Sequence, residues 1–322
     1  MSVIIYRIFS MMFMCGLIFT GSVHAQQSTL RVILPIGPGS AVDGMIRTAG
    51  PALSQALGQN VVIENMPGAG GITGTSALVK AEPNGNIIAF VSNNHVVNPS
   101  VFKSMPFDSL KDITPISIVG NSPFVLVVNA KTVSAKNAKE LQAFLKAKPD
   151  EYNYGSSGNG TIIHLAGEMF VQAADVKVRH IPYKGMGPMV TDLISGQVQM
   201  GAAAISAVQA QIKNGTLRAI GVMGKNRAPS LPDVPTLAEQ GFPEVDVQGW
   251  FAAIGPAKLP ADQVARIHAG IVKAFNDPLV KERLLQQDNL VDPSTPEVAQ
   301  QYFKSEHDTY AKLIQKAGLK VD

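Results

Sequence analysis

The chain has 322 residues, of which 46% are hydrophobic and 16% are charged. Its formal net charge is only +3, and no stretch is rich in lysine and arginine. This composition excludes a disordered chain and provides no basic patch for a nucleic acid, so no nucleic-acid partner is expected.

The first 25 residues have the organisation of a secretory signal peptide. Arg7 supplies a positive charge, Ile8–Phe19 is almost entirely apolar, and Val23-His24-Ala25 resembles a cleavage site with small residues. We therefore expect an exported protein, periplasmic in a bacterium, that is cleaved near Ala25. The remaining chain is long enough for two domains of about 150 residues each.

The chain has one cysteine, Cys15, and it lies within this signal segment. The exported chain would therefore lack disulfides, cysteine nucleophiles and cysteine-bound metals. No later apolar run reaches the length of about 18 residues that a membrane-spanning helix needs. These observations favour a soluble exported protein.

After the signal segment, short apolar strands alternate with amphipathic helices. The predicted strands are 30–34, 61–63, 87–91, 124–128, 176–178, 198–200 and 217–222. The predicted helices are 43–57, 72–80, 138–146, 161–173, 189–193 and 206–213. This alternation is typical of an α/β fold with mostly parallel sheets. Three more helices are predicted near the C-terminal end, each opening near a proline, at 260–275, 278–287 and 296–317.

The predicted domains are joined without a long flexible linker. Two domains arranged in this way are most simply connected by strands that cross between them, and the candidate strands are 113–128 and 245–254. The expected first domain is therefore discontinuous, with residues 26–125 plus 248–322. The second domain, residues 126–247, would be inserted into it.

Two glycine-rich loops, 35–43 and 154–161, each precede a predicted helix. Such a loop presents free backbone N–H groups and the positive end of the helix dipole, which together bind an anion without any basic side chain. In α/β sheets, ligands bind at the carboxyl ends of the strands, where both loops are expected. Two facing loops would form an anion-binding cleft. The alternative is that both loops are ordinary turns.

Nucleotide-binding and catalytic motifs fit the chain poorly. Gly155 and Gly160 have the spacing of the Walker A glycines, but Thr161 occupies the position of the essential lysine. The chain contains neither a G-x-S-x-G nor an H-E-x-x-H motif. We therefore expect no catalytic residue, no metal site and no cofactor.

Three ionisable residues near the predicted cleft have separate interpretations. Asp43 is expected to cap its helix and to pair with Arg47, four residues later. His164 lies in the first turn of a predicted helix and is interpreted as a hydrogen-bonded structural residue, with a general base as the alternative. His95 follows the strand 87–91 and is a candidate for the cleft.

The loops belong to a set of motifs that resembles the Bug family of extracytoplasmic solute receptors, the binding proteins of tripartite tricarboxylate transporters. The motifs extend over nearly the whole exported chain: 35–43 with Arg47, 64–71, 154–161 with 164–166, 182–185 and 231–236. The resemblance implies a type II periplasmic binding fold, in which two α/β domains close over a small carboxylate. It also implies delivery of that ligand to membrane permease subunits, and a monomer is the expected state of such a carrier.

In the family, main-chain N–H groups of both loops hold the carboxylate of the ligand. The expected ligand-binding residues of the first loop are Ile36, Gly37, Pro38, Gly39, Ser40 and Asp43. Those of the second loop are Ser156, Ser157, Gly158, Asn159, Gly160 and Thr161. The segment Ser92-Asn93-Asn94-His95 follows a strand and is expected to line the cleft, with Ser92, Asn93 and His95 as ligand-binding residues. Tyr183, Lys184 and Ala203 are also expected at the cleft.

The chain departs from the family pattern near Ala203. Family members often carry an Asp or another polar residue there, whereas residues 202–204 of this chain are all alanine. A carboxylate at this position could pair with the ammonium group of a ligand, and alanine cannot. The hypothesis is that the ligand is a carboxylate without an α-amino group, or an aromatic or aliphatic acid.

Two other functions are compatible with the sequence. A receptor of this kind could present its ligand to a sensor rather than to a transporter. An exported hydrolase is the second alternative, with Ser157 as the nucleophile and His164 as its base. The hydrolase requires His164 Nε2 to lie within hydrogen-bonding distance of a serine Oγ that faces the cleft.

Overall fold

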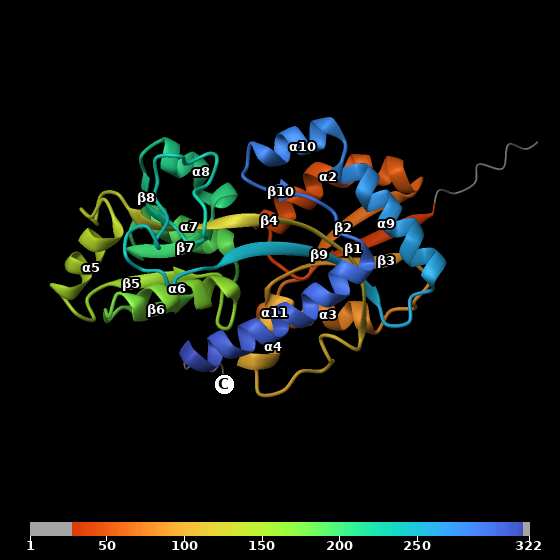
Figure 1. The fold of residues 1–322 in the computed structure, drawn as a ribbon, viewed down its shortest axis with the longest axis horizontal. Coiled ribbons are helices and arrows are strands. Elements are labelled where there is room, and N and C mark those ends of the chain that lie inside the picture. Colours follow the sequence, from red (N-terminus) through yellow and green to blue (C-terminus); the bar gives the residue numbers. More distant parts are fainter. Residues whose placement is uncertain (1–27, 318–322) are drawn as a thin grey trace, which may run out of the picture.

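The computed structural model describes residues 28–317 of the chain. The predicted signal segment, its cleavage near Ala25 and Cys15 lie outside the described residues. The described chain is an elongated α/β structure in which strands and helices alternate, as predicted (Figure 1). Between residues 28 and 317, no helix combines the length and the apolar character that crossing a membrane requires.

Ten strands form one continuous curled sheet. Their order is β2-β1-β3-β9-β4-β7-β5-β6, with β8 and β10 also paired to β4. Their bounds are β1 Thr29–Leu34, β2 Asn60–Asn65, β3 Ile87–Ser92, β4 Ile113–Asn129, β5 Asn153–Ser156, β6 Arg179–Pro182, β7 Met200–Ala204, β8 Leu217–Val222, β9 Gln248–Pro256 and β10 Leu290–Val291.

The long strand β4 joins two parts of this sheet. Its residues 113–123 pair with β9, and its residues 124–129 pair with β7 and β8. We call the strands β1, β2, β3, β9 and β10, with the helices that pack on them, the β1 part. The strands β5 to β8, with their helices, are the β7 part. The chain passes from the β1 part to the β7 part along β4, and it returns into β9 (Figure 1).

The sheet is mixed, which differs from the mostly parallel sheet that the sequence predicts. The outer pairs in both parts are parallel: β1 with β2 and β3, and β5 with β6 and β7. The pairs that involve β4 or β9 are antiparallel. The difference arises because the two crossing strands run against their neighbours, which an alternation of strands and helices along the chain does not reveal.

Helices cover both faces of the sheet. Their bounds are α2 Ala41–Leu57, η1 Ala69–Gly71, α3 Ile72–Val79, α4 Asn94–Val101, α5 Ala138–Lys146, α6 Ile162–Ala173, α7 Met186–Ser195, α8 Ile205–Lys213, α9 Ala261–Phe275, α10 Pro278–Leu285 and α11 Pro296–Ala317. Alternate residues of β1 enter different cores: Val32 packs in one cluster with α2 and α9, and Ile33 in another with α3 and α4. Because both faces are covered there, the segment from Val32 to Leu34 is apolar and fully buried, whereas Thr29 and Arg31 nearer the start of the strand are exposed.

Helix α2 shows how the sequence sets the start and end of an element. Ser40 caps its N-terminus by accepting a hydrogen bond from the N–H of Asp43, and Gly58 ends it in a left-handed conformation. Gly270 of α9 faces α2 at close range, since a Cβ there would lie 2.3 Å from Leu57 Cδ2. The glycine therefore permits the close packing of α2 against α9.

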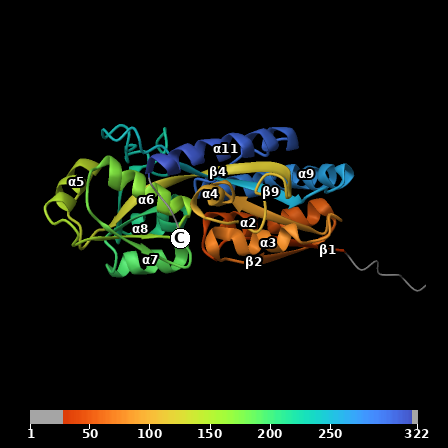
Figure 2. The same ribbon diagram turned by 90° about the horizontal axis from the view of Figure 1, so that it is seen from below.

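The C-terminal helix α11 extends along β4 and contacts elements of both parts (Figure 2). Its residues Phe303 and Tyr310 are buried. Its Glu306 accepts a hydrogen bond from the indole Nε1 of Trp250, on β9, at 2.8 Å. Burial raises the pKa of this carboxyl group. Helix α11 thus packs on the crossing strands, on the same side of the sheet as α4.

Several local predictions differ from the structure. The strand predicted at residues 198–200 is found at Met200–Ala204, and Asn153–Ser156, which lies mostly in the predicted loop 154–161, forms β5. A strand is predicted at residues 176–178 and is found at Arg179–Pro182 instead. Residues 94–101, for which the sequence predicts no element, form α4. Val178 is packed against the core although it is not in the strand, so its apolar character reflects burial rather than strand pairing.

Candidate ligand-binding cleft

A cleft of about 450 Å³ lies between the β1 part and the β7 part. Its walls come from segments that are far apart in the sequence but meet where strands of both parts end. The lining residues are Pro35, Ile36, Gly37, Ser40, Ala41, Val42, 67–71, Ser92, Asn93, Asn94, Phe102, Phe124, Ser157, Gly158, Asn159, 161–163, 183–186, Ala204, Gly249 and Phe251.

The first glycine loop leads into α2 on the wall from the β1 part. Asp43 does not cap the helix as predicted, because Ser40 is the N-cap. Instead, Asp43 Oδ2 accepts the N–H of Gly39 at 3.1 Å, and its Oδ1 accepts Arg47 Nε at 2.9 Å, which confirms the predicted ion pair. Asp43 is buried against its own loop and does not line the cleft. Arg47 balances the negative charge of Asp43, and the hydrogen bond from Gly39 fixes the conformation of the loop.

The second glycine loop leads into α6 on the opposite wall. Thr161 caps α6 by accepting the N–H of His164, and it donates its own hydroxyl to the carbonyl of Gly158 at 2.8 Å. Gly158 and Gly160 have φ values of +134° and +72°, which favour glycine. These two conformations turn the loop so that Ser157, Gly158 and Asn159 line the cleft.

The N-termini of α2 and α6 therefore open on the same cleft from opposite sides. In the first turn of α2, Asp43 N–H is bonded to Ser40 Oγ and Gly44 N–H to the Ser40 carbonyl. The other first-turn N–H groups belong to Ala41 and Val42, which line the cleft. Such groups have no partner within their own helix and carry the positive end of its dipole. An anion placed between the two helices is stabilised from both sides.

One hydrogen bond spans the cleft between its walls. Asn94, at the start of α4, accepts the N–H of Ile162, in the first turn of α6, at 2.8 Å. The Asn94 side chain is 8% exposed, so this bond is largely shielded from water. It ties the β1 part to the β7 part at the point where a ligand would be held. Asn94 belongs to the segment 92–95 that the sequence predicts to line the cleft, and it is one of the lining residues.

Replacing Asn94 by alanine is expected to lower the affinity for a carboxylate about three- to tenfold. The reason is that one net hydrogen bond of about 0.5–1.5 kcal/mol no longer favours the closed cleft. Isothermal calorimetry measures the change. Asn137→Ala is a matched control, because it removes an N-cap bond of α5 away from the cleft. An unchanged affinity in Asn94→Ala would show that the bond does not contribute to closure.

Asn93, next to Asn94, is bound to the crossing strand rather than exposed to a ligand. Its Nδ2 donates to the carbonyl of Gln248 at 3.0 Å and to the hydroxyl of Tyr310, and its Oδ1 accepts Trp250 N–H at 2.9 Å. Its backbone borders the cleft, but its amide group is fully occupied by β9 and α11. Asn93 thus links the cleft to the crossing strand β9 and to α11.

A third segment of the cleft wall, residues 67–71, was not among the predicted site residues. Gly68, Ala69, Gly70 and Gly71 all have positive φ values, and for Ala69 this is unusual because it has a side chain. A Cβ at Gly71 would lie 2.9 Å from the carbonyl oxygen of Pro35. The segment therefore packs directly against the first glycine loop. The sequence feature that could have identified this segment is its three glycines in four residues, at 68–71.

The predicted site residues divide into two groups. The structure brings eleven of them to the cleft: Ile36, Gly37, Ser40, Ser92, Asn93, Ser157, Gly158, Asn159, Thr161, Tyr183 and Lys184. It places the other seven away from the cleft lining: Pro38, Gly39, Asp43, His95, Ser156, Gly160 and Ala203. Ala203 is fully buried in β7, and its neighbour Ala204 lines the cleft instead.

Lys184 is the one charged side chain among the described lining residues. It is exposed to solvent, which limits the electrostatic contribution that it can make to a bound anion. Its neighbour Tyr183 donates its hydroxyl to Asp192 at 2.8 Å, and burial together with this carboxylate raises the tyrosine pKa to about 12. Tyr183 is therefore neutral, and its hydroxyl is directed at α7.

Two stacked histidines, the buried His164 and the half-buried His180, contact residues of the second glycine loop. The rings of His164 and His180 stack with centroids 3.9 Å apart. His164 Nδ1 accepts the N–H of Gly160 at 3.1 Å, and His180 Nε2 lies 2.7 Å from Ser156 Oγ. Burial lowers the pKa of His164 to about 4. Burial and the neighbouring His164 lower that of His180 to about 3. Both rings are neutral at pH 7.

The arrangement that the hydrolase alternative requires does not occur at Ser157. Its hydroxyl lies 3.1 Å from Thr161 Oγ1, and His164 bonds through Nδ1 to Gly160. The serine that does contact a histidine is Ser156, which is fully buried and does not line the cleft. Within residues 28–317, no group of three or more His, Cys, Asp or Glu residues could hold a metal ion.

His95 lies in the core, where it is 4% exposed. Its Nε2 donates to the carbonyl of Ser109 at 2.7 Å, so its Nδ1 is unprotonated, and this buried atom has no partner among the described residues. Burial lowers its pKa to about 4. Between pH 6.5 and 4 the unfolded chain binds a proton that the folded protein does not, so folding stability falls as the pH falls.

We expect this histidine to contribute up to about 3 kcal/mol of stability that is present above pH 6.5 and lost by pH 4. Urea unfolding at a series of pH values measures the effect. His95→Phe should give a shallower loss of stability over that range, since phenylalanine can stack between Phe107 and Phe303 but cannot titrate. Equal slopes for the two proteins would contradict the assignment of a neutral, buried His95.

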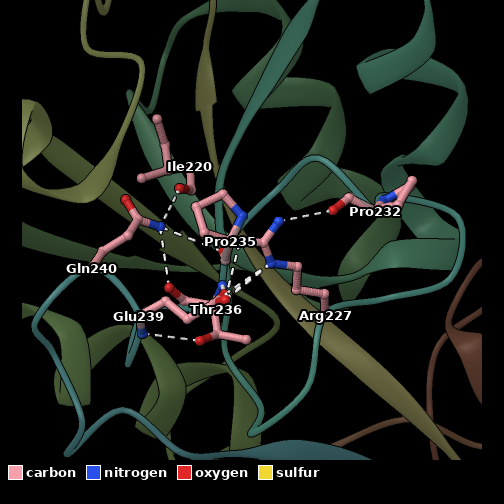
Figure 3. A network of polar contacts seen from close by, with 7 residues as sticks. All are labelled: Ile220, Arg227, Pro232, Pro235, Thr236, Glu239 and Gln240. Carbon is pink, nitrogen blue, oxygen red and sulfur yellow. Dashed lines mark hydrogen bonds and ion pairs between the residues drawn. The ribbon is translucent and has the colours of Figure 1, made fainter.

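The motif 231–236 has a structural role away from the cleft (Figure 3). Thr236 N–H donates to Glu239 Oε2, and Glu239 N–H donates to Thr236 Oγ1, so the two residues cap the turn reciprocally. Arg227 donates to both carboxylate oxygens of Glu239 and to the carbonyl of Pro232. This guanidinium lowers the pKa of Glu239. None of residues 231–236 lines the cleft.

The curled sheet and the cleft between its two parts have the architecture of solved periplasmic binding proteins. The solved structure of the periplasmic binding protein BugD superposes with a TM-score of 0.87 at 29% identity, covering 91% of this chain and 99% of BugD. MatC from Rhodopseudomonas palustris, solved with bound malate, superposes with a TM-score of 0.84 at 25% identity, covering 89% of this chain and 99% of MatC.

A family model, "Tripartite tricarboxylate transporter family receptor", matches residues 45–319, and the chain belongs to this family. Among curated proteins, Protein BugT of Bordetella pertussis (strain Tohama I) is 32% identical over 294 residues, which cover 91% of this chain and 90% of BugT. The predicted family and fold class are therefore confirmed.

Proposed function

We propose that this protein captures a small carboxylate in the cleft and delivers it to the permease subunits of a tripartite tricarboxylate-type transporter. The observation that carries the proposal is the convergence of the α2 and α6 N-termini on one cleft whose described lining contains no Asp or Glu. The malate in the structure of MatC supports a carboxylate as the class of ligand.

The proposed movement is closure of two domains about the crossing strands. In this proposal the first domain comprises residues 26–125 plus 248–322, the second comprises 126–247, and β4 and β9 form the hinge. The protein acts as a monomer in the periplasm after cleavage near Ala25, and it needs no cofactor. The Asn94–Ile162 bond supports this division, because it joins the two proposed domains across the cleft.

The test is native mass spectrometry of the exported protein, followed by a thermal-shift screen of small mono- and dicarboxylates. The proposal predicts a monomer of the cleaved chain and a rise in Tm with at least one carboxylate, which is recovered chemically unchanged. Conversion of the bound acid into a product would identify an enzyme instead. The absence of a shift with every carboxylate would contradict the proposed function.

A further inference from the structure

The cleft has two chemically different regions. The polar region consists of the two glycine loops with Ser40, Ser157 and Thr161. The second region is apolar and includes three phenylalanine rings, Phe102, Phe124 and Phe251. Because the two regions differ in this way, the cleft selects the charged group of a ligand and also the polarity of the rest of the molecule.

The crossing strands provide the apolar floor of the cleft. Phe124 on β4 and Phe251 on β9 are only 5% and 3% exposed, and both are cleft-lining residues. The Phe124 ring lies directly over Gly249, because a Cβ at that position would be 2.8 Å from its Cε1 atom. Gly249 thus leaves room for the ring to lie across the floor.

A third phenylalanine, Phe102, lies on the cleft wall formed by the β1 part. Phe102, which follows α4, is half-buried and lies beside Gly70, where a Cβ would be 3.5 Å from its Cε2 atom. Across the cleft, the apolar residues Ile162, Ile163 and Met186 line the opposite wall. A ligand held at the loops therefore has aromatic and aliphatic carbon on several sides of its body.

The charges of the lining exclude a second ionised group on the ligand. No Asp or Glu among the described lining residues could pair with an ammonium group. Lys184 is exposed, so a second carboxylate directed at the phenylalanines would lose its hydration without gaining an ion pair. The burial of an unpaired charge is strongly unfavourable.

Resting on the proposed function, we propose that the ligand is a monocarboxylate whose body is an aromatic ring or an apolar group of similar size. Its carboxylate is bound by the N–H groups at the two helix N-termini. Its body packs against Phe102 and the floor formed by Phe124 and Phe251. A hydroxy diacid or an amino acid places polar or charged groups in the apolar region and binds more weakly.

Calorimetry of the exported protein with benzoate, cyclohexanecarboxylate, malate, glutamate and benzamide tests this proposal. We expect benzoate or cyclohexanecarboxylate to bind at least 30-fold more tightly than malate and glutamate. Benzamide, which has the ring without the charge, should bind at least tenfold more weakly than benzoate. Tighter binding of malate or glutamate would overturn the inference but leave the proposed function in place. Failure of every carboxylate to bind would overturn both.

A variant of Phe102 tests the contact with the ligand body. Phe102→Ala should lower the affinity for benzoate about tenfold, because it removes an aromatic surface from the cleft wall. Phe144→Ala is the matched control, since Phe144 is also partly buried but packs against Tyr152 away from the cleft. An equal effect of the two variants, or no effect of Phe102→Ala, would contradict the proposed position of the ring.

Discussion

Gly158→Ala is expected to lower the affinity for a carboxylate at least tenfold while the protein stays folded. Gly158 has a φ of +134°, and a Cβ there would lie 3.2 Å from the carbonyl oxygen of Tyr183. An alanine in such a conformation costs about 1–3 kcal/mol, which the loop can relieve only by changing its shape. The carbonyl of Gly158 also accepts the Thr161 hydroxyl. A change at Gly158 therefore disturbs the cap of α6 and the N–H groups beside it.

Gly215→Ala separates this effect from a general loss of stability. Gly215 also has a positive φ, +76°, but a Cβ there meets nothing within 4 Å, and the residue does not line the cleft. The control should lower the Tm by a few degrees and leave the affinity unchanged. Calorimetry and thermal unfolding of both variants provide the comparison. If Gly158→Ala binds a carboxylate as tightly as the unaltered protein, the second loop does not hold the anion.

Ala204→Asp is expected to lower the affinity for a carboxylate more than 100-fold. Ala204 lines the cleft, where the described residues supply only Lys184 as a balancing charge. The repulsion between two poorly solvated carboxylates costs several kcal/mol. The variant should fold, because Ala204 is the N-cap of α8 in an extended conformation, and aspartate is a favoured residue at that position.

Ala204→Asn is the control for the size and polarity of the new side chain. Asparagine is close to aspartate in shape and is also a good N-cap, but it carries no charge. Its affinity for a carboxylate should stay within about threefold of the unaltered protein. Equal losses in the Asp and Asn variants would show that position 204 acts through shape and not through charge. Tighter binding of an amino acid to Ala204→Asp would indicate that the aspartate pairs with a ligand ammonium group.

The elements on which the cleft is built could be predicted because their signals are local. The loops 35–43 and 154–161 combine glycines that adopt positive φ with a Ser or Thr that caps the next helix. Each feature depends on residues close together in the sequence. The α/β class followed from the alternation of apolar strands and amphipathic helices, and the resemblance to the Bug family implied the type II periplasmic binding fold. The mixed character of the sheet did not, because strand direction depends on pairing between residues far apart.

The phenylalanine floor of the cleft and the Asn94–Ile162 hydrogen bond could not be predicted, because both depend on residues far apart in the sequence. Phe102, Phe124 and Phe251 are separated by more than 20 residues from one another, and only the pairing of β4 with β9 places the last two together. Asn94 and Asn93 are neighbours with different roles, one bonded to α6 and the other to β9. Both lie in the segment 92–95 that the sequence predicts to line the cleft, and nothing in the local sequence distinguishes their bonding partners.

Ala203 illustrates how a correct segment can yield the wrong residue. Successive side chains on a strand point to opposite faces, so an error of one residue moves a predicted position to the other face of the sheet. Ala203 is fully buried within β7, and Ala204 lines the cleft. His95 is a similar case. It follows β3 as predicted, but α4 turns it toward Phe107 and Phe303 and away from the cleft.

The most direct test is a crystal structure of the exported protein with bound benzoate. The account predicts that the carboxylate lies between the N-termini of α2 and α6. Its oxygens should be about 2.7–3.2 Å from backbone N–H groups of both loops, and the ring should face Phe102, Phe124 and Phe251. A carboxylate held only by Lys184, or bound outside the cleft, would contradict the claim that two helix N-termini recognise the ligand.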